Sequence, residues 1–264
     1  MKCESNSLVN NKLLNILLIQ VGTPPDELKD EHGDLPLWFS RAMAMAPDAI
    51  EVVKVFSGET LPNPDPNRIA VITGSWNMVT DKLEWSENTA KWIRCAIEAG
   101  MPLFGVCYGH QLMAHALGGT VDYHPQGREM GCLEINLTEA GKNDPLTRGF
   151  SEGFRAHLTH LQTVTKLPPC AQSLASSTHD KNQIIRYSAK ALSTQFHPEF
   201  TPDIAASLIH LRSEILLHEG FEPAAMRSAL IDATDARKLL KRFISIHAAH
   251  AQTVIPECED AINN

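Results

Sequence analysis

The chain has 264 residues, of which 43% are hydrophobic and 20% are charged, which is the composition of a globular protein with one sizeable core. Lysine and arginine total 23 against 31 acidic residues, so the net charge is −8, and the charges are scattered along the chain. This acidic balance gives no electrostatic reason to expect nucleic acid or an anionic membrane as a partner.

The first apolar run covers residues 13–21 and ends at a glycine that is followed closely by two prolines. Its length and its breakers predict a buried strand. The run is too short to cross a bilayer, and no small-residue cleavage site follows it. We therefore expect neither a membrane span nor a signal peptide.

Strand-like and helix-like segments then alternate through the first half of the chain. The apolar spacing predicts helices at residues 35–46 and 84–99, and strands at residues 50–56 and 68–73. Three prolines make residues 57–67 a surface loop. Strands that alternate with helices predict an α/β fold with a mostly parallel central sheet and helices on both faces.

The second half of the chain has a different pattern. Short, punctuated apolar runs predict strands joined by turns, partly antiparallel, at residues 132–137, 154–158, 173–177, 183–187 and 191–196. Thr201 and Pro202 then form a helix start, and the helical spacing continues to Gly220. A second helix, either continuous or interrupted, is expected from about residue 223 to 251. We interpret residues 1–200 as one domain and residues 201–264 as a helical C-terminal extension packed on it.

The six cysteines are far apart and include no Cys-x-x-Cys pair. This spacing favours neither a zinc site nor a disulfide scaffold, and it is typical of a reducing compartment, so we expect a cytoplasmic protein. A metal site built on His157 and His160 is also not expected, because residues three apart on a strand face opposite sides.

The most informative segment is residues 101–111, where an apolar strand leads into Gly-x-Cys-x-Gly and a helix follows at once. This pattern predicts a nucleophile elbow with Cys107 in a strained backbone conformation. Gly105 and Gly109 would be required because side chains there would collide with neighbouring elements. The helix N-terminus favours a thiolate, and the N–H of Tyr108 would point toward an oxyanion. The alternative is a buried structural cysteine beside two packing glycines.

A thiolate nucleophile needs a proton-transferring partner, and the chain has twelve histidines. His197 is the best candidate because it ends a predicted strand and is followed by a proline that stiffens the chain. Glu199 lies two residues further on, close enough to bond the far imidazole nitrogen and fix its tautomer. The alternative for His197 is an ordinary histidine in a loop at the end of a strand.

Together these two motifs resemble the class I glutamine amidotransferases, particularly the amidotransferase domain of GMP synthase and its stand-alone relatives. The resemblance covers residues from about 69 to 200. It implies the flavodoxin-like architecture of that family. It also implies a catalytic triad of Cys107, His197 and Glu199, with Gly74 offering a second oxyanion N–H beside that of Tyr108.

The resemblance further implies a substrate pocket. Gln111 matches the glutamine that the family uses to hold substrate, and Thr159 with His160 falls where relatives have a Ser-His pair. Two departures stand out, since threonine replaces serine and Gln162 stands where many relatives carry an acid. The substrate would be glutamine or another γ-glutamyl compound, and the reaction would pass through a thioester without a metal or organic cofactor.

In GMP synthase a second domain uses ATP, and such domains carry a Gly-rich phosphate loop that this sequence lacks. We therefore expect either a hydrolase that acts alone or a subunit that delivers ammonia to a separate acceptor subunit. One alternative is a γ-glutamyl peptidase acting on glutathione-like compounds. Another is a non-catalytic module that binds a γ-glutamyl ligand or a partner protein, although such a module would not need the complete Cys-His-Glu set.

Overall fold

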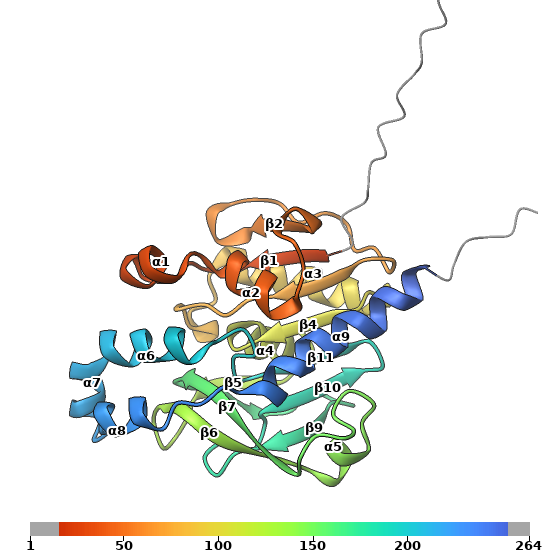
Figure 1. Cartoon of the computed structure of the whole chain (residues 1–264). Coiled ribbons are helices and arrows are strands. Elements are labelled where there is room, and N and C mark those ends of the chain that lie inside the picture. Colours follow the sequence, from red (N-terminus) through yellow and green to blue (C-terminus); the bar gives the residue numbers. More distant parts are fainter. Residues whose placement is uncertain (1–15, 253–264) are drawn as a thin grey trace, which may run out of the picture.

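The structure, a computed structural model, describes residues 16–252 of the chain (Figure 1). Within these residues nine strands form one sheet in the order β2-β1-β3-β4-β11-β10-β9-β6-β7. In that order the strands are Ile50–Lys54, Ile16–Gln20, Ile69–Ile72, Leu103–Val106, Ala191–Thr194, Ile184–Ser188, Gln172–Ser176, Glu129–Leu137 and Gly153–His160. The first five are parallel neighbours, and the remaining pairs are antiparallel. The parallel half has the 2-1-3-4-5 order of flavodoxin-like sheets.

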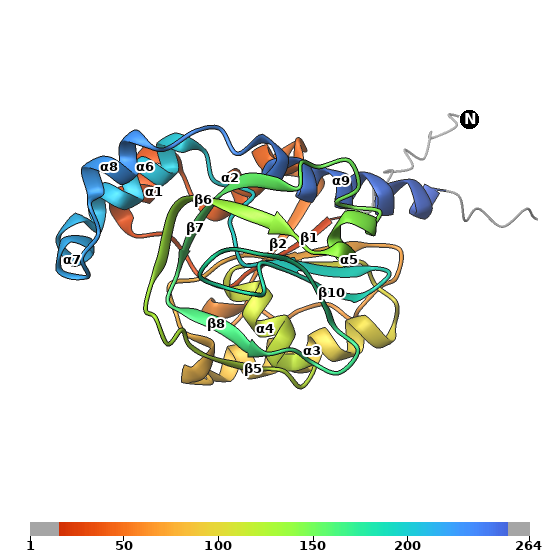
Figure 2. The same cartoon turned by 90° about the horizontal axis from the view of Figure 1, so that it is seen from below.

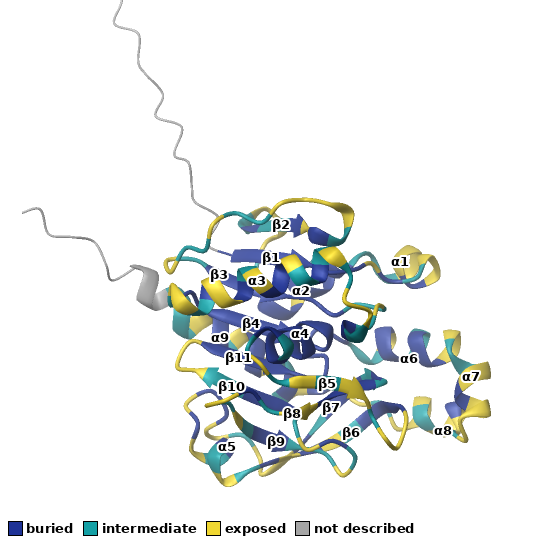
Figure 3. Cartoon of the chain, turned by 180° about the vertical axis from the view of Figure 1, so that it is seen from behind, coloured by how far each residue is buried: buried dark blue, intermediate teal, exposed yellow. Residues whose placement is uncertain are grey.

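Helices cover both faces of the parallel half (Figure 2). One face carries α2 (Leu35–Met43) and α9 (Thr234–Gln252), and the other carries α3 (Glu84–Glu98) and α4 (Tyr108–Ala116). Strand β1 shows the reason, since Leu18 packs in the core on the α2 side and Leu17 packs in the core on the α3 side. Both side chains are fully buried, as are the central strands in general (Figure 3). The expected α/β fold with helices on both faces is confirmed.

The segment after Phe200 is helical, as expected, but it is more broken than the sequence pattern predicts. Thr201 caps the first helix by accepting a hydrogen bond from the N–H of Ile204 at 3.3 Å. The single helix expected up to Gly220 is wrong: it is divided into α6 (Pro202–Leu211) and α7 (Ser213–His218), with Arg212 between them. The second expected helix is present in its interrupted form, as α8 (Pro223–Ser228) and α9.

These breaks have a packing reason. Helices α6, α7 and α8 lie together at one end of the sheet, whereas α9 runs across the face that also carries α2 (Figure 1). A continuous helix could not turn from the sheet end onto that face. The division of the chain into residues 1–200 and 201–264 stays a prediction.

Several smaller elements of the structure are not predicted by the sequence pattern. In the described part of the chain these are the two-stranded sheet of β5 (Thr120–Tyr123) and β8 (Gln162–Lys166), the short helices α1 (Asp26–His32) and α5 (Glu139–Asn143), and the 3-10 turns Pro47–Ala49, Val55–Ser57 and Val79–Asp81. Strand β5 is mostly exposed, so it has no alternating apolar pattern to detect. The first predicted strand begins at residue 16 in the structure, and residues 13–15 lie outside the described residues.

Two further findings bear on earlier expectations. No helix in the described residues has the length and apolarity needed to span a membrane. The cysteines of the described part, namely Cys95, Cys107, Cys132 and Cys170, all carry free thiols.

Candidate active site

Cys107 lies at the junction between β4 and α4, as the elbow pattern predicts. Its backbone has φ 52° and ψ −101°, an unfavourable conformation for a residue with a side chain. The N–H of Cys107 donates to the carbonyl of Thr194 at 2.8 Å, which ties the elbow to the end of β11. The side chain is 6% exposed and reaches the edge of a cavity. The fold therefore holds a thiol in a strained turn at the carboxyl ends of parallel strands.

The two flanking glycines are required by close backbone contacts. A Cβ on Gly105 would lie 2.6 Å from the carbonyl oxygen of Gly109, and a Cβ on Gly109 would lie 2.7 Å from the carbonyl oxygen of Ile72. These distances are shorter than van der Waals contact, and backbone atoms cannot move aside easily. The expected collisions with the neighbouring strand and helix are confirmed.

We expect Gly109→Ala to lower the free energy of unfolding by about 1–3 kcal/mol, because the added methyl group overpacks the junction. The sign of this change in unfolding free energy distinguishes a close-packed junction from an open one. Gly109 lies in the first turn of α4, and an unobstructed Gly→Ala change inside a helix would instead stabilise by about 1 kcal/mol. Urea unfolding of the two proteins measures the difference. A variant at least as stable as the parent would show that the junction is not close-packed.

His197 is fixed from several sides. Its N–H donates to the carbonyl of His157 at 2.9 Å, and its ring stacks on Phe200 with centroids 4.1 Å apart. The ring Nδ1 donates to Oε1 of Glu199 at 2.7 Å, and both side chains are buried. Nε2 is buried without a hydrogen-bond partner among the described residues. The carboxylate therefore sets the tautomer and leaves Nε2 to act on another group.

Gly74 allows His197 and Cys107 to come together. A Cβ on Gly74 would lie 3.2 Å from Cε1 of His197 and 3.6 Å from Cβ of Cys107. The absence of a side chain here lets the imidazole and the thiol share one pocket wall. Next to this wall is a small cavity of about 30 Å³, and the residues that line it include Gly74, Cys107, His197 and Glu199. The structure thus brings together the three residues expected to form the triad.

The charges in this cluster favour a protonated imidazole. Burial alone would lower the pKa of His197, but the carboxylate of Glu199 and the adjacent Cys107 outweigh it and raise the pKa to about 10. Because the pKa is raised, His197 holds its proton at neutral pH and loses it only as the pH rises toward 10. A histidine that is positively charged beside a cysteine is the arrangement that stabilises a thiolate.

The two residues whose backbone N–H groups are expected to form the oxyanion hole, Gly74 and Tyr108, both lie next to Cys107. Neither Gly74 nor Tyr108 has a hydrogen-bond acceptor for its backbone N–H among the described residues. Tyr108 is the first residue of α4, and its side chain points away, with its hydroxyl 2.7 Å from Oγ of Ser86. Burial of that phenol, helped by Asp81 and Glu87 and opposed by the Ser86 hydrogen bond, raises its pKa to about 12. Only the main chain of Tyr108 is therefore available to the site.

A cavity of about 300 Å³ opens beside Cys107 and contains all three of the expected substrate-binding residues. Gln111 donates from Nε2 to the carbonyl of Gln162 at 2.7 Å and to Oε1 of Gln195 at 3.0 Å. Both amide hydrogens are thus engaged, and only its carbonyl oxygen can meet a ligand. The carbonyl of Thr159 lies 3.9 Å from Sγ of Cys107, so Thr159 borders the nucleophile directly.

His160 lines the same cavity but is held by the protein at both ring nitrogens. Nε2 lies 2.8 Å from Oε2 of Glu129, which is the residue directly opposite in the β6–β7 register, and Nδ1 lies 2.9 Å from the carbonyl of Gln162. Both partners are oxygen acceptors, so the protein engages the ring at both nitrogens and leaves neither of them free for a ligand. Burial would raise the pKa of Glu129, but its hydrogen bonds with His160 and Ser177 hold it below its usual value.

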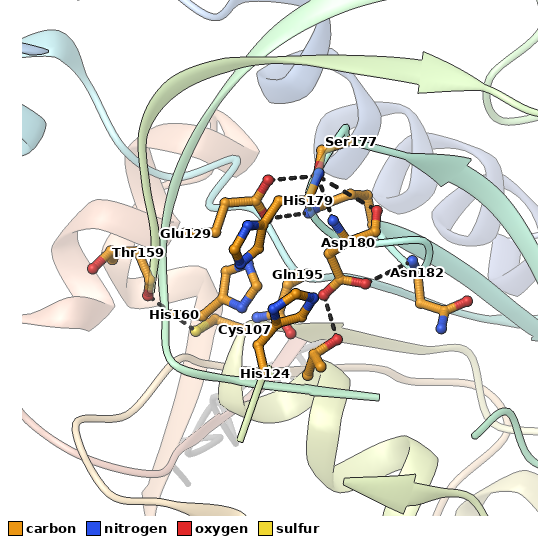
Figure 4. A network of polar contacts seen from close by, with 12 residues as sticks. Cys107, His124, Glu129, Thr159, His160, Ser177, His179, Asp180, Asn182 and Gln195 are labelled. Atoms are coloured by element: carbon orange, nitrogen blue, oxygen red, sulfur yellow. Dashed lines mark hydrogen bonds and ion pairs between the residues drawn. The ribbon is translucent and has the colours of Figure 1, made fainter. Parts of the chain in front are cut away.

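Figure 4 shows this polar network beside the nucleophile. Glu129, His160 and Asp180 are close enough to share an ion, since their ligand atoms lie within 4.8 Å of one another. Both ring nitrogens of His160 are already engaged by the protein, and Asp180 already accepts from Thr163 and Asn182. The network is better suited to supporting the cavity wall than to binding a metal, and the absence of a metal cofactor stays a prediction.

Sequence reasoning missed several residues of the cavity, above all Arg212. This side chain projects from the break between α6 and α7, and its Nη1 donates to Oγ1 of Thr159 at 2.9 Å. Arg128 and Trp76 also line the cavity. The side chain of Gln162 accepts a hydrogen bond from the N–H of Val79 at 3.1 Å, so it is held by the turn at that residue. No local motif marks Arg212, because tertiary packing alone places it here.

Comparisons with known proteins give a consistent result. The family model described as "Glutamine amidotransferase class-I" matches residues 49–210, more than half of the chain. The glutamine-hydrolyzing GMP synthase of Clostridium novyi is 31% identical over 144 residues, which are 54% of this chain and 26% of that protein. A relative named as one subunit of the glutamine-hydrolyzing GMP synthase of Saccharolobus solfataricus is 30% identical over 130 residues, which are 49% of this chain and 65% of that protein. This chain therefore spans less than two thirds of either relative.

Among solved structures, a glutamine amidotransferase from Thermotoga maritima superposes with a TM-score of 0.70. The match covers 89% of this chain and 98% of the other, at 20% sequence identity. At that identity the likeness establishes a shared fold.

Proposed function

Since the chain belongs to the class I glutamine amidotransferase family, we propose that it hydrolyses the γ-amide of glutamine through a γ-glutamyl thioester on Cys107. The observation that carries the proposal is the buried His197, whose Nδ1 is held by Glu199 at 2.7 Å while Nε2 has no partner in the described residues. A buried nitrogen without a hydrogen-bond partner lowers the stability of the fold, and a role in proton transfer gives a reason for its being kept.

The first half-reaction forms the thioester. The Cys107 thiolate attacks the amide carbon of the substrate, and the N–H groups of Gly74 and Tyr108 stabilise the oxyanion. His197 then donates its Nε2 proton to the departing nitrogen, the C–N bond breaks, and ammonia leaves. The imidazole is now neutral and Cys107 carries the glutamyl group.

The second half-reaction releases glutamate. Neutral His197 takes a proton from water, which attacks the thioester carbon, and the same two N–H groups hold the new oxyanion. Collapse of this intermediate breaks the C–S bond and restores the thiolate beside the imidazolium. Glu199 remains ionised throughout, because its role is to orient the ring and stabilise its charge.

A γ-glutamyl peptidase reaction on glutathione-like compounds is the second candidate. Arg212 lines the cavity beside Cys107 and has no carboxylate partner among the described residues, and this favours substrates that carry carboxylates. The chemistry at Cys107 would be identical, with an amino acid in place of ammonia as the leaving group. A non-catalytic binding module is less well supported, because it gives no reason for the unpartnered Nε2 of His197.

One relative is named as a subunit of a synthase, and this supports the further proposal that ammonia passes to a separate acceptor protein. The 264-residue sequence contains no Gly-rich phosphate-cradling loop with which to activate an acceptor itself. The proposal therefore separates two activities, amide hydrolysis by this chain and acceptor activation by another.

We expect the purified chain to release glutamate and ammonia from L-glutamine in equal amounts, at a rate that ATP, magnesium and xanthosine monophosphate do not increase. The physical reason is that hydrolysis needs only the thiol, the imidazole and the oxyanion hole. Coupled assays for glutamate and ammonia, with γ-glutamylcysteine as a second substrate, measure this. Formation of an aminated nucleotide by the chain alone would contradict the expectation, and a much higher rate on γ-glutamylcysteine would favour the peptidase reaction.

A further inference from the structure

Arg212 lies in the wall of the cavity beside the nucleophile and has no carboxylate partner among the described residues. Within that part of the chain the only hydrogen bond of its side chain is the one from Nη1 to the hydroxyl of Thr159. Arg128, the other arginine of the cavity, is paired with Glu219 through two hydrogen bonds, at 2.7 Å and 3.1 Å. One guanidinium is therefore neutralised within the protein, and the other keeps its charge directed at the cavity.

An unpaired charge in this position has a cost that a ligand could offset. Burial, reinforced by the nearby charge of Arg128 and opposed by Cys107 and Glu219, lowers the pKa of Arg212 to about 10, so the side chain is still charged at neutral pH. A guanidinium that is removed from bulk water without a counterion is unfavourable. A carboxylate from a substrate would make charge-assisted, bidentate hydrogen bonds with it.

Arg212 and the nucleophile contact the same residue, an arrangement that suits a γ-glutamyl group. Thr159 contacts both side chains, since its carbonyl lies 3.9 Å from Sγ of Cys107 and its hydroxyl lies 2.9 Å from Nη1 of Arg212. In an extended γ-glutamyl group the α-carboxylate carbon is four bonds, about 5 Å, from the amide carbon. A substrate lying along Thr159 can thus reach both groups at once.

The described part of the cavity offers nothing equivalent to the α-ammonium group of such a substrate. No aspartate or glutamate is among the described residues that line the larger cavity. The smaller cavity beside it contains Glu199, but the Oε1 of that carboxylate is engaged by His197, and its Oε2 is buried away from solvent. Gln162 is neutral, and its side chain is bound to the turn at Val79. An ammonium group in the larger cavity would therefore meet neutral acceptors such as the carbonyl oxygen of Gln111.

Resting on the proposed function, we infer that Arg212 binds the α-carboxylate of the γ-glutamyl substrate, and that this enzyme recognises the carboxylate far more strongly than the α-amino group. Arg212 is thus a specificity residue supplied by the segment after the triad. The break between α6 and α7 has a function in this view, because it turns the arginine into the cavity.

Three amides of similar size allow the contributions of the substrate's α-carboxylate and α-ammonium groups to be measured separately. L-Glutamine carries both, glutaramate lacks the amino group, and 4-aminobutanamide lacks the carboxylate. For the parent protein we expect kcat/KM on glutaramate to lie within about 10-fold of that on glutamine, and kcat/KM on 4-aminobutanamide to be lower by about 100-fold. Arg212→Gln should lose about 100-fold on glutamine and on glutaramate but change little on 4-aminobutanamide.

Arg227→Gln is the matched control, because Arg227 is an exposed arginine on the neighbouring helix α8 and does not line this cavity. It should leave all three rates unchanged. The rate at which iodoacetamide alkylates Cys107 provides a second readout, and Arg212→Gln should change it little. Equal loss on all three amides, or slower alkylation by a similar factor, would overturn the inference and make Arg212 a support of the thiolate. No loss on any amide would also overturn it.

The failure of the proposed function looks different in the same experiment. If the parent protein hydrolyses none of the three amides and no γ-glutamyl peptide, the amidase reaction itself is wrong. If the parent hydrolyses glutamine but Arg212→Gln does so equally well, only the role of Arg212 is wrong.

Discussion

Cys107→Ala is expected to abolish γ-glutamyl hydrolysis, with a loss in kcat of roughly 10,000-fold or more, because no other thiol of the described residues lines the cavity to form the thioester. Cys107→Ser should be nearly as inactive, since a serine hydroxyl is a much weaker nucleophile than a cysteine thiol. Both variants should keep the fold, because the side chain is small and sits at the edge of a cavity. Glutamate release and urea unfolding measure the two effects.

Cys95→Ala is the matched control for this pair. Cys95 is an exposed free thiol on α3, so its loss should leave both activity and stability unchanged. Turnover in Cys107→Ala at the parental rate would rule out the thioester mechanism. Loss of activity in Cys95→Ala would point to a second thiol that the mechanism does not include.

His197→Ala is expected to cost far more than Glu199→Gln. The histidine moves protons in both half-reactions, whereas Glu199 orients the ring and stabilises its charge through one hydrogen bond of 2.7 Å. In related triads the loss of the orienting acid is smaller than the loss of the base by about 50- to 100-fold in kcat, and we expect a similar ratio here. Steady-state kinetics on L-glutamine measures it, and equal losses in two folded variants would mean that Glu199 contacts the substrate.

The pH profile gives an independent readout of the same pair. His197 must be protonated to release ammonia, so kcat/KM of the parent should fall as the pH rises through the pKa of about 10. The charge of Glu199 raises that pKa, and a neutral glutamine removes this contribution. The alkaline limb of the Glu199→Gln profile should therefore move to lower pH. An unmoved limb would show that another group controls it.

How much of the site could be predicted depends on how local its residues are. The elbow is encoded within five residues, Gly105 to Gly109, and the collision that requires Gly105 is with Gly109 of the same motif. Gly109 is required by Ile72 of β3, which is distant in sequence, but the motif itself is local. His197 and Glu199 are two positions apart, so their contact follows from a short turn. Because each of the two motifs is short, sequence reasoning can find it.

The parts that could not be predicted depend on distant packing. His160 meets Glu129 because strands β6 and β7 pair in one register, and a shift by one residue would separate them. Arg212 reaches the cavity only because a helix is interrupted at that position, and helical periodicity predicts no interruption there. The sequence pattern indicates which residues are apolar, but not where a helix must bend to pack at the end of the sheet.

The most direct test of the central claim is to identify the covalent intermediate. A sample that is turning over L-glutamine is quenched in acid, digested and examined by mass spectrometry for a glutamyl group bound to cysteine. The account predicts that the glutamyl group is found on the peptide containing Cys107, that it disappears when hydroxylamine is added, and that it is absent from Cys107→Ala. A glutamyl group on Cys95, Cys132 or Cys170, or full turnover with no adduct at Cys107, would contradict it.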